Sequence, residues 1–146
     1  MKKELVAKVN GYLANIAVSY VKLHNLHWNV VGPQFKAVHE YLELLYDAYA
    51  LVLDSVAELL KMNGEMPLAS MKDYLAAATI REVDAKDYSV SEVITLVLAD
   101  METMKAQAEA IRAAAAEDDN YTLVNLLEDD LKNYDKNIWF LKSMLK

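Results

Sequence analysis

Four long stretches of this chain carry apolar residues at three- and four-residue steps, which is the period of one face of an α-helix. They cover approximately residues 3–30, 35–62 and 89–116, and a fourth stretch follows residue 120. Only three glycines and two prolines occur in 146 residues, so tight turns are rare. The periodicity therefore predicts four long helices joined by few connections.

The breaks between these stretches contain residues that end or begin helices. Gly32-Pro33 ends the first one, because proline cannot continue the backbone hydrogen-bond ladder. The Asn-Gly pair at 63–64 places glycine at the usual C-terminal position of a helix, and the Ser-x-x-Glu at 89–92 is a capping box. The acidic segment 117–120 separates the last two stretches, and the fourth apolar stripe continues to Leu145.

Residues 64–89 form the only long connection. Within it, Leu68 to Ala78 is predicted to be a short helix that opens just after Pro67. A connection of this length allows the third long helix to run parallel to the second. The predicted fold is all-α, a four-helix bundle with a short extra helix in the crossover between helices two and three, and residues 1–146 are expected to form a single domain.

Composition excludes several classes of function. The chain has no cysteine, which rules out disulfides and thiolate metal sites. Its longest uncharged run, residues 9–21, is too short to span a bilayer, and we expect a soluble cytoplasmic protein. The net charge is −7, without the basic footprint of nucleic-acid binding, so DNA binding is not expected. An acidic surface does attract cations.

Candidate metal ligands are concentrated in the second predicted helix. His39 and Glu43 are four residues apart. Asp54 and Glu58 repeat that spacing, and at about 100° per residue all four side chains share one helix face. However, fifteen residues separate His39 from Asp54, or about 22 Å along the helix axis. One helix therefore cannot bring both pairs to the same ion.

A second, antiparallel copy of the helix would bring the first pair of one chain opposite the second pair of the other. Such a two-fold arrangement creates two equivalent sites, and His27 of the preceding helix could join the His39 end. Imidazole and carboxylate ligands suit iron, manganese or zinc. Pairs at this spacing also commonly stabilise a solvated helix face, so spacing alone leaves both interpretations open.

The candidate ligands lie within a longer motif, which consists of HNLHWNVVGPQF at 24–35, His39-Glu40 and DSVAE at 54–58. This motif resembles the signature of the Dps family of mini-ferritins. The segments GEMPLASMKDY at 64–74 and DKNIW at 135–139 are also similar to that family, so the resemblance extends over nearly the whole chain. It implies a ferritin-like bundle with a short crossover helix, assembled into a hollow shell of twelve subunits.

The resemblance also implies a set of iron ligands at the two-fold interfaces of such a shell. One subunit would supply the residues matching His27, His39 and Glu43, and its neighbour those matching Asp54 and Glu58. The implied reaction oxidises Fe(II) to Fe(III), with hydrogen peroxide preferred over oxygen, and stores the ferric mineral inside the shell. His24 and the helical tyrosines are interpreted as mainly structural.

Two other functions remain as alternatives. Some members of the family compact DNA through lysine-rich tails, but only Lys2 and Lys3 precede the first predicted helix here. A conventional ferritin builds its di-iron centre inside one chain from Glu-x-x-His motifs. No Glu-x-x-His occurs in this sequence and no histidine follows His39, which argues against a centre of that kind. A catalytically silent helical assembly would be expected to have lost ligands.

Overall fold

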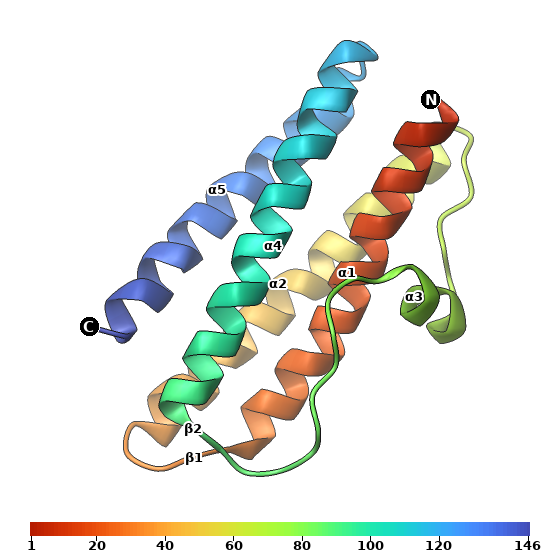
Figure 1. The fold of residues 1–146 in the computed structure, drawn as a ribbon. Coiled ribbons are helices and arrows are strands. Elements are labelled where there is room, and N and C mark those ends of the chain that lie inside the picture. The colour runs from red at the N-terminus through yellow and green to blue at the C-terminus, as the bar shows by residue number, and fades with distance from the viewer.

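The computed structural model describes all residues, 1–146, and has the predicted all-α fold, a bundle of four long helices with a short extra helix in the crossover (Figure 1). Its four long helices begin and end close to the predicted positions. The first and last residues of the second long helix are the predicted ones, 35 and 62. In chain order the elements are α1 (Lys3–Asn29), β1 (Val30–Val31), α2 (Phe35–Met62), α3 (Met71–Ala77), β2 (Tyr88–Ser89), α4 (Val90–Glu117) and α5 (Tyr121–Met144).

The helices form two antiparallel pairs, α1 with α2 and α4 with α5 (Figure 1). The crossover returns along the length of the bundle, so α2 and α4 run in the same direction, as predicted. The helix inside this crossover begins later than predicted. It starts at Met71 because the Ser70 side chain accepts a hydrogen bond from the Asp73 backbone, which makes Ser70 rather than Pro67 the start signal.

Two short strands, which the sequence pattern did not predict, join the chain at one end of the bundle. β1 pairs with β2 in parallel, with Val30 opposite Tyr88 and Val31 opposite Ser89. Ser89 also caps α4 in the predicted capping box with Glu92. Because β1 follows α1 and β2 precedes α4, this pairing holds the end of α1 beside the beginning of α4. The loop that leads into α2 begins at the same place.

Asparagines of α1 hold the crossover against the bundle. The buried Asn15 side chain accepts hydrogen bonds from the backbone N–H groups of residues 79–80 at 2.8 and 3.0 Å. Asn10 both accepts from and donates to other parts of the crossover backbone, and Asn25 donates to two of its carbonyl oxygens. These polar contacts fix the path of a segment that contains little regular structure.

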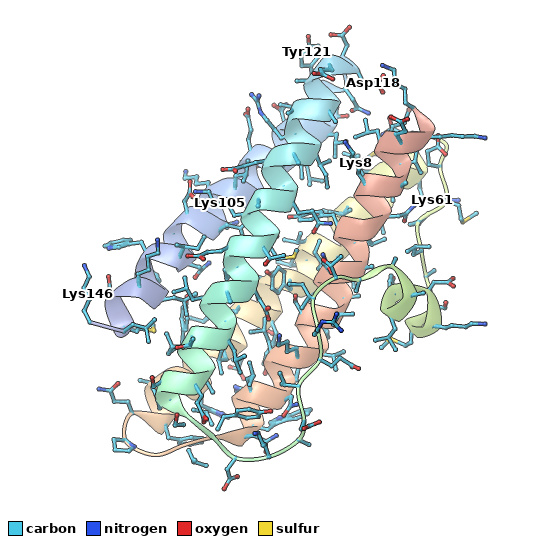
Figure 2. All side chains as sticks on the ribbon, in the orientation of Figure 1. Lys8, Lys61, Lys105, Asp118, Tyr121 and Lys146 are labelled. Carbon is cyan, nitrogen blue, oxygen red and sulfur yellow. The ribbon has the colours of Figure 1, made fainter.

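Charged side chains are spread over the outside of the bundle (Figure 2). Lys8, Lys105 and Lys146 lie on or next to three different helices. Lys105 pairs with Asp135 of the neighbouring helix at 2.7 Å. None of the helices combines the length and the apolar character needed to cross a membrane.

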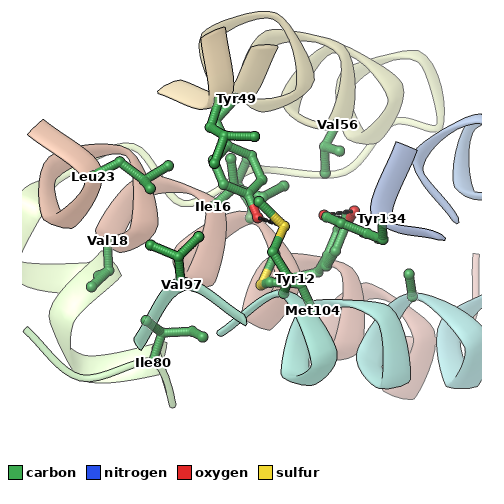
Figure 3. Packing of buried hydrophobic residues seen from close by; sticks show 14 of the residues in the cluster. Tyr12, Ile16, Val18, Leu23, Tyr49, Val56, Ile80, Val97, Met104 and Tyr134 are labelled. Carbon is green, nitrogen blue, oxygen red and sulfur yellow. Dashed lines mark hydrogen bonds between the residues drawn. The ribbon is translucent and has the colours of Figure 1, made fainter. Parts of the chain in front are cut away.

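The apolar stripes of the four long helices meet in one core (Figure 3). The residues predicted for these stripes are buried or half-buried, except Leu145, which lies at the end of α5 and is 42% exposed. That prediction was wrong because the helix ends at Met144, where the bundle no longer covers the chain. The core therefore follows the sequence period up to the helix ends.

Polar groups also lie inside this core. The hydroxyl of Tyr12 donates to Asp130 Oδ2 at 2.7 Å. It also lies 2.6 Å from the hydroxyl of Tyr134 (Figure 3). Burial raises the pKa of Asp130 to about 6. Elsewhere in the core, Lys22 of α1 pairs with Asp100 of α4 at 2.6 Å. The helices are thus joined by specific polar contacts as well as by apolar packing.

Candidate metal centre

His27 and His39 lie side by side where α1 ends and α2 begins. Their rings are stacked, with centroids 3.7 Å apart and planes inclined by 12°. Phe35 also stacks against His39, with the two ring centroids 5.1 Å apart. His27 is only 5% exposed, whereas His39 is half-buried. The fold therefore brings together two histidines that are twelve positions apart in the sequence.

Each of these histidines is oriented by the backbone of the other. The Nδ1 atom of His27 lies 2.6 Å from the carbonyl oxygen of His39, and Nδ1 of His39 lies 2.7 Å from that of His27. Because a carbonyl oxygen only accepts, both Nδ1 atoms must donate and carry the proton. In the neutral rings both Nε2 atoms keep a free lone pair, which is the arrangement found in metal-binding histidines.

Glu43 lies one turn after His39 on α2 and is exposed. The Tyr46 hydroxyl donates to Glu43 Oε1 at 3.2 Å. Burial, and next the charge of Glu43, raise the pKa of Tyr46, so the phenol keeps the proton that it donates. The sequence assigned Tyr46 to packing. Its positions three residues after Glu43 and seven after His39, on the same helix face, were the signal that could have identified it.

His24 belongs to the surroundings of this group. Its Nδ1 atom donates to the carbonyl oxygen of Tyr20 at 2.7 Å, one turn earlier on α1. Its ring stacks on Tyr46 at 3.7 Å and lies 5.5 Å from the ring of Trp28. These contacts agree with a structural role for His24.

Asp54 and Glu58 lie far from the histidines, near the other end of α2. Both are exposed, and no ion pair within the chain includes either of them. No group of three or more histidine, aspartate or glutamate side chains in this single chain is arranged to hold a metal ion. The structure therefore brings His27 and His39 together, with Glu43 one turn away, and leaves the two remaining predicted ligands separate.

Large apolar side chains are exposed on α2 and at the end of α1. Leu44 is 68% exposed and Leu51 is 74% exposed, and both lie on α2 between the two groups of predicted ligands. Trp28, next to His27, is 68% exposed. Leu44 and Leu51 are seven residues apart and therefore share one face of α2, and an exposed apolar face is typical of surfaces that contact another protein.

The chain is similar to known proteins over nearly its whole length. A family model described as the ferritin-like domain matches residues 6–146. The DNA protection during starvation protein 2 of Bacillus anthracis is 32% identical over 145 residues, which are 99% of each chain. The crystal structure of a Dps protein from Bacillus brevis is similar with a TM-score of 0.94 and 33% identity, over 100% of both chains.

A more distant solved structure extends the same similarity. The Dps protein of Vibrio cholerae, described as a member of a broad superfamily of ferritin-like diiron-carboxylate proteins, is 26% identical with a TM-score of 0.94. The similarity covers 99% of this chain and 90% of that one. The fold and nearly the full length of these proteins are therefore shared.

Proposed function

Because the chain belongs to the Dps family of ferritin-like proteins, we propose that it is a ferroxidase and iron store. It oxidises Fe(II) with hydrogen peroxide, and more slowly with oxygen, at centres shared by two copies of the chain. The ligands are His27, His39 and Glu43 of one copy and Asp54 and Glu58 of the other. The Fe(III) product is stored inside a closed shell, for which the family suggests twelve subunits.

The observation that carries this proposal is the reciprocal pair of hydrogen bonds between His27 and His39. Here the backbone fixes the proton on Nδ1 of both rings and leaves both Nε2 atoms as acceptors. Two adjacent imidazoles prepared in this way, one turn from a carboxylate, form one half of a hard-metal site.

The other half is proposed to come from a second copy. Along the axis of α2, Asp54 lies about 22 Å and Glu58 about 28 Å from His39, and an antiparallel copy of the helix would bring both to the end that holds the histidines. Leu44 and Leu51 lie between the two groups, and burying their exposed side chains would stabilise such a pairing. A two-fold contact of this kind contains two identical centres.

The chemistry follows from the number of electrons. Reduction of one hydrogen peroxide to water takes two electrons, and each Fe(II) supplies one. Two iron ions bound side by side can therefore complete the reduction without releasing hydroxyl radical. Carboxylates and neutral imidazoles bind both ions, and the negative charge of the carboxylates favours the Fe(III) product. Removal of Fe(II) and peroxide together protects the cell from oxidative damage.

The test is oxidation of Fe(II), added without oxygen and followed by hydrogen peroxide. Wild-type protein should form the ferric absorbance with one peroxide consumed for two Fe(II). The variants His27→Ala and Asp54→Ala should lose rapid oxidation, because each removes a ligand from every centre. Glu40→Ala, which changes an exposed carboxylate beside His39, is the control and should keep the wild-type rate. If the double variant of His27 and Asp54 oxidises iron as fast as wild type, the assignment of the ligands is wrong.

Direct compaction of DNA has no supporting observation in this chain. The net charge is −7, and the lysines are distributed over all the helices in the sequence. The name of the Bacillus anthracis relative speaks of DNA protection, and removing iron and peroxide protects DNA without contact. We expect no gel shift of duplex DNA at physiological salt, and a shift would contradict this expectation.

A further inference from the structure

Glu43 differs from the two carboxylates near the other end of α2 in having a partner within its own chain. The only hydrogen bond to its carboxylate comes from the hydroxyl of Tyr46, at 3.2 Å. An exposed glutamate has many rotamers, and it loses that freedom when it binds a cation. A donor that already holds one of its oxygens reduces this loss.

Tyr46 is itself held in place from three sides. Its ring stacks on His24 at 3.7 Å, with the planes inclined by 22°. It meets His27 edge-on at 5.2 Å and Tyr20 edge-on at 6.1 Å. His24 in turn donates to the backbone carbonyl of Tyr20 at 2.7 Å. A chain of contacts thus leads from the backbone of α1 through two rings to the carboxylate of Glu43.

This arrangement leaves Glu43 free to bind a metal. A carboxylate has about four lone-pair positions, and the phenol occupies one of them on Oε1. The other oxygen has no partner in the chain. The hydroxyl therefore orients the carboxylate without competing for all of its binding capacity, as do the outer partners of many metal ligands.

We propose that Tyr46 is a positioning residue, which holds Glu43 ready for one of the two iron ions of the proposed centre. The inference rests on the proposed function, since it needs a metal site at this end of α2. In it, His24 supports the ring of Tyr46, and the hydroxyl of Tyr46 sets the affinity for the ion that Glu43 binds. The other ion, which Glu43 does not bind, is unaffected.

The test uses the assembled protein and cobalt(II), which does not react with peroxide in the way that Fe(II) does and whose visible absorption reports its ligands. Titration followed by absorption and calorimetry should show two cobalt ions bound per centre in wild type. Tyr46→Phe keeps the ring and its stacking and removes only the hydroxyl. It should weaken the binding of one ion by about 10- to 100-fold and leave the other unchanged.

Tyr41→Phe is the matched control. Tyr41 also lies on α2, but its hydroxyl donates to Asn137 of α5 at 2.8 Å, away from the predicted ligands. Its loss should leave both cobalt affinities unchanged. In a Glu43→Gln background, Tyr46→Phe should have no further effect, because the two residues act through one interaction.

The outcomes separate this inference from the proposed function. If wild type binds two ions per centre and Tyr46→Phe binds both equally well, the positioning role is overturned while the ferroxidase proposal stands. An equal loss of affinity with and without Glu43 would also overturn it, since the effect would then be structural. If wild-type protein binds no cobalt at these residues, both proposals fail.

Discussion

The two groups of proposed ligands differ in their contacts within the chain. Near the beginning of α2, His27, His39 and Glu43 each have a hydrogen-bond partner in their own chain. Near the end of α2, Asp54 and Glu58 have no ion-pair partner in their own chain. The first group is ordered by the fold of a single chain. The second is exposed and free to adapt. The difference suggests that one half of the centre is built during folding and that the other is ordered only by a second chain and by metal.

At the level of Asp54, buried polar contacts join α1 and α5 inside the bundle. His27 is level with His39 in the antiparallel pair of α1 and α2. Tyr12 precedes His27 by fifteen residues on α1, and Asp54 follows His39 by fifteen residues on α2. Because the two helices are antiparallel, Tyr12 is about level with Asp54. Tyr12 is completely buried and bonds to Asp130 and Tyr134. At this end, the polar interactions lie inside the core of the bundle and do not orient the proposed ligands.

The largest change in folding stability is expected at this core network. The folded-state pKa of Asp130 is raised to about 6 by burial, so the folded chain holds its proton more tightly than the unfolded chain does. This group therefore lowers stability as the pH rises from about 4 to about 6, and the cost is complete above that range. Asp130→Asn should raise the free energy of unfolding at pH 7 by up to about 3 kcal/mol.

Urea unfolding of both proteins between pH 4 and pH 7 measures this effect. The stability advantage of the Asp130→Asn variant should shrink as the pH falls, and its iron oxidation should equal that of wild type. Parallel pH profiles for the two proteins would mean that Asp130 is not perturbed by burial. A loss of iron oxidation would mean that the core side and the ligand side of α2 are not independent.

A smaller difference in stability should separate two variants that both lose iron oxidation. His27→Ala removes a buried ring and leaves the carbonyl oxygen of His39 without its donor, which should cost about 1–3 kcal/mol. Asp54→Ala removes an exposed side chain and should change stability by less than about 0.5 kcal/mol. Unfolding of the metal-free proteins at one concentration measures both. Equal losses of stability would contradict the difference between the two halves.

The smallest change in the folding of the protomer is expected at Leu51. Its side chain is 74% exposed, so Leu51→Lys should alter protomer stability by less than about 0.5 kcal/mol. The same change places a charge in the proposed contact between two copies and should prevent assembly. Light scattering should then show a smaller particle, and oxidation of Fe(II) should be lost. An assembled and active variant would show that this face is not the contact.

The sequence predicted the helices because local signals were sufficient. The apolar period, the Gly-Pro at 32–33 and the capping box at 89–92 act within a few residues, and the structure agrees with them. It did not predict the pairing of β1 with β2 or the bonds of Tyr12 to Asp130, because these join residues far apart in the chain. The contact of Glu43 with Tyr46 is local, but a tyrosine on a helical stripe is more often packing.

At the proposed site, too, the sequence predicted local neighbours and did not predict contacts between distant residues. Spacing identified His39 and Glu43 as neighbours, and in the fold His27 lies beside His39. The partners of the two histidines are backbone carbonyls, which every residue has and no sequence pattern marks. The approach of Asp54 and Glu58 depends on a second chain, which remains a prediction.

Mixing two inactive variants tests the shared centre most directly. A chain with Asp54→Ala retains His27, and a chain with His27→Ala retains Asp54, so a dimer of the two contains one intact centre and one that lacks both residues. After unfolding and refolding together in equal amounts, about half of the dimers are mixed, and about a quarter of the wild-type rate of Fe(II) oxidation should return. If the mixture stays as inactive as the separate variants, the centre is not shared between two chains.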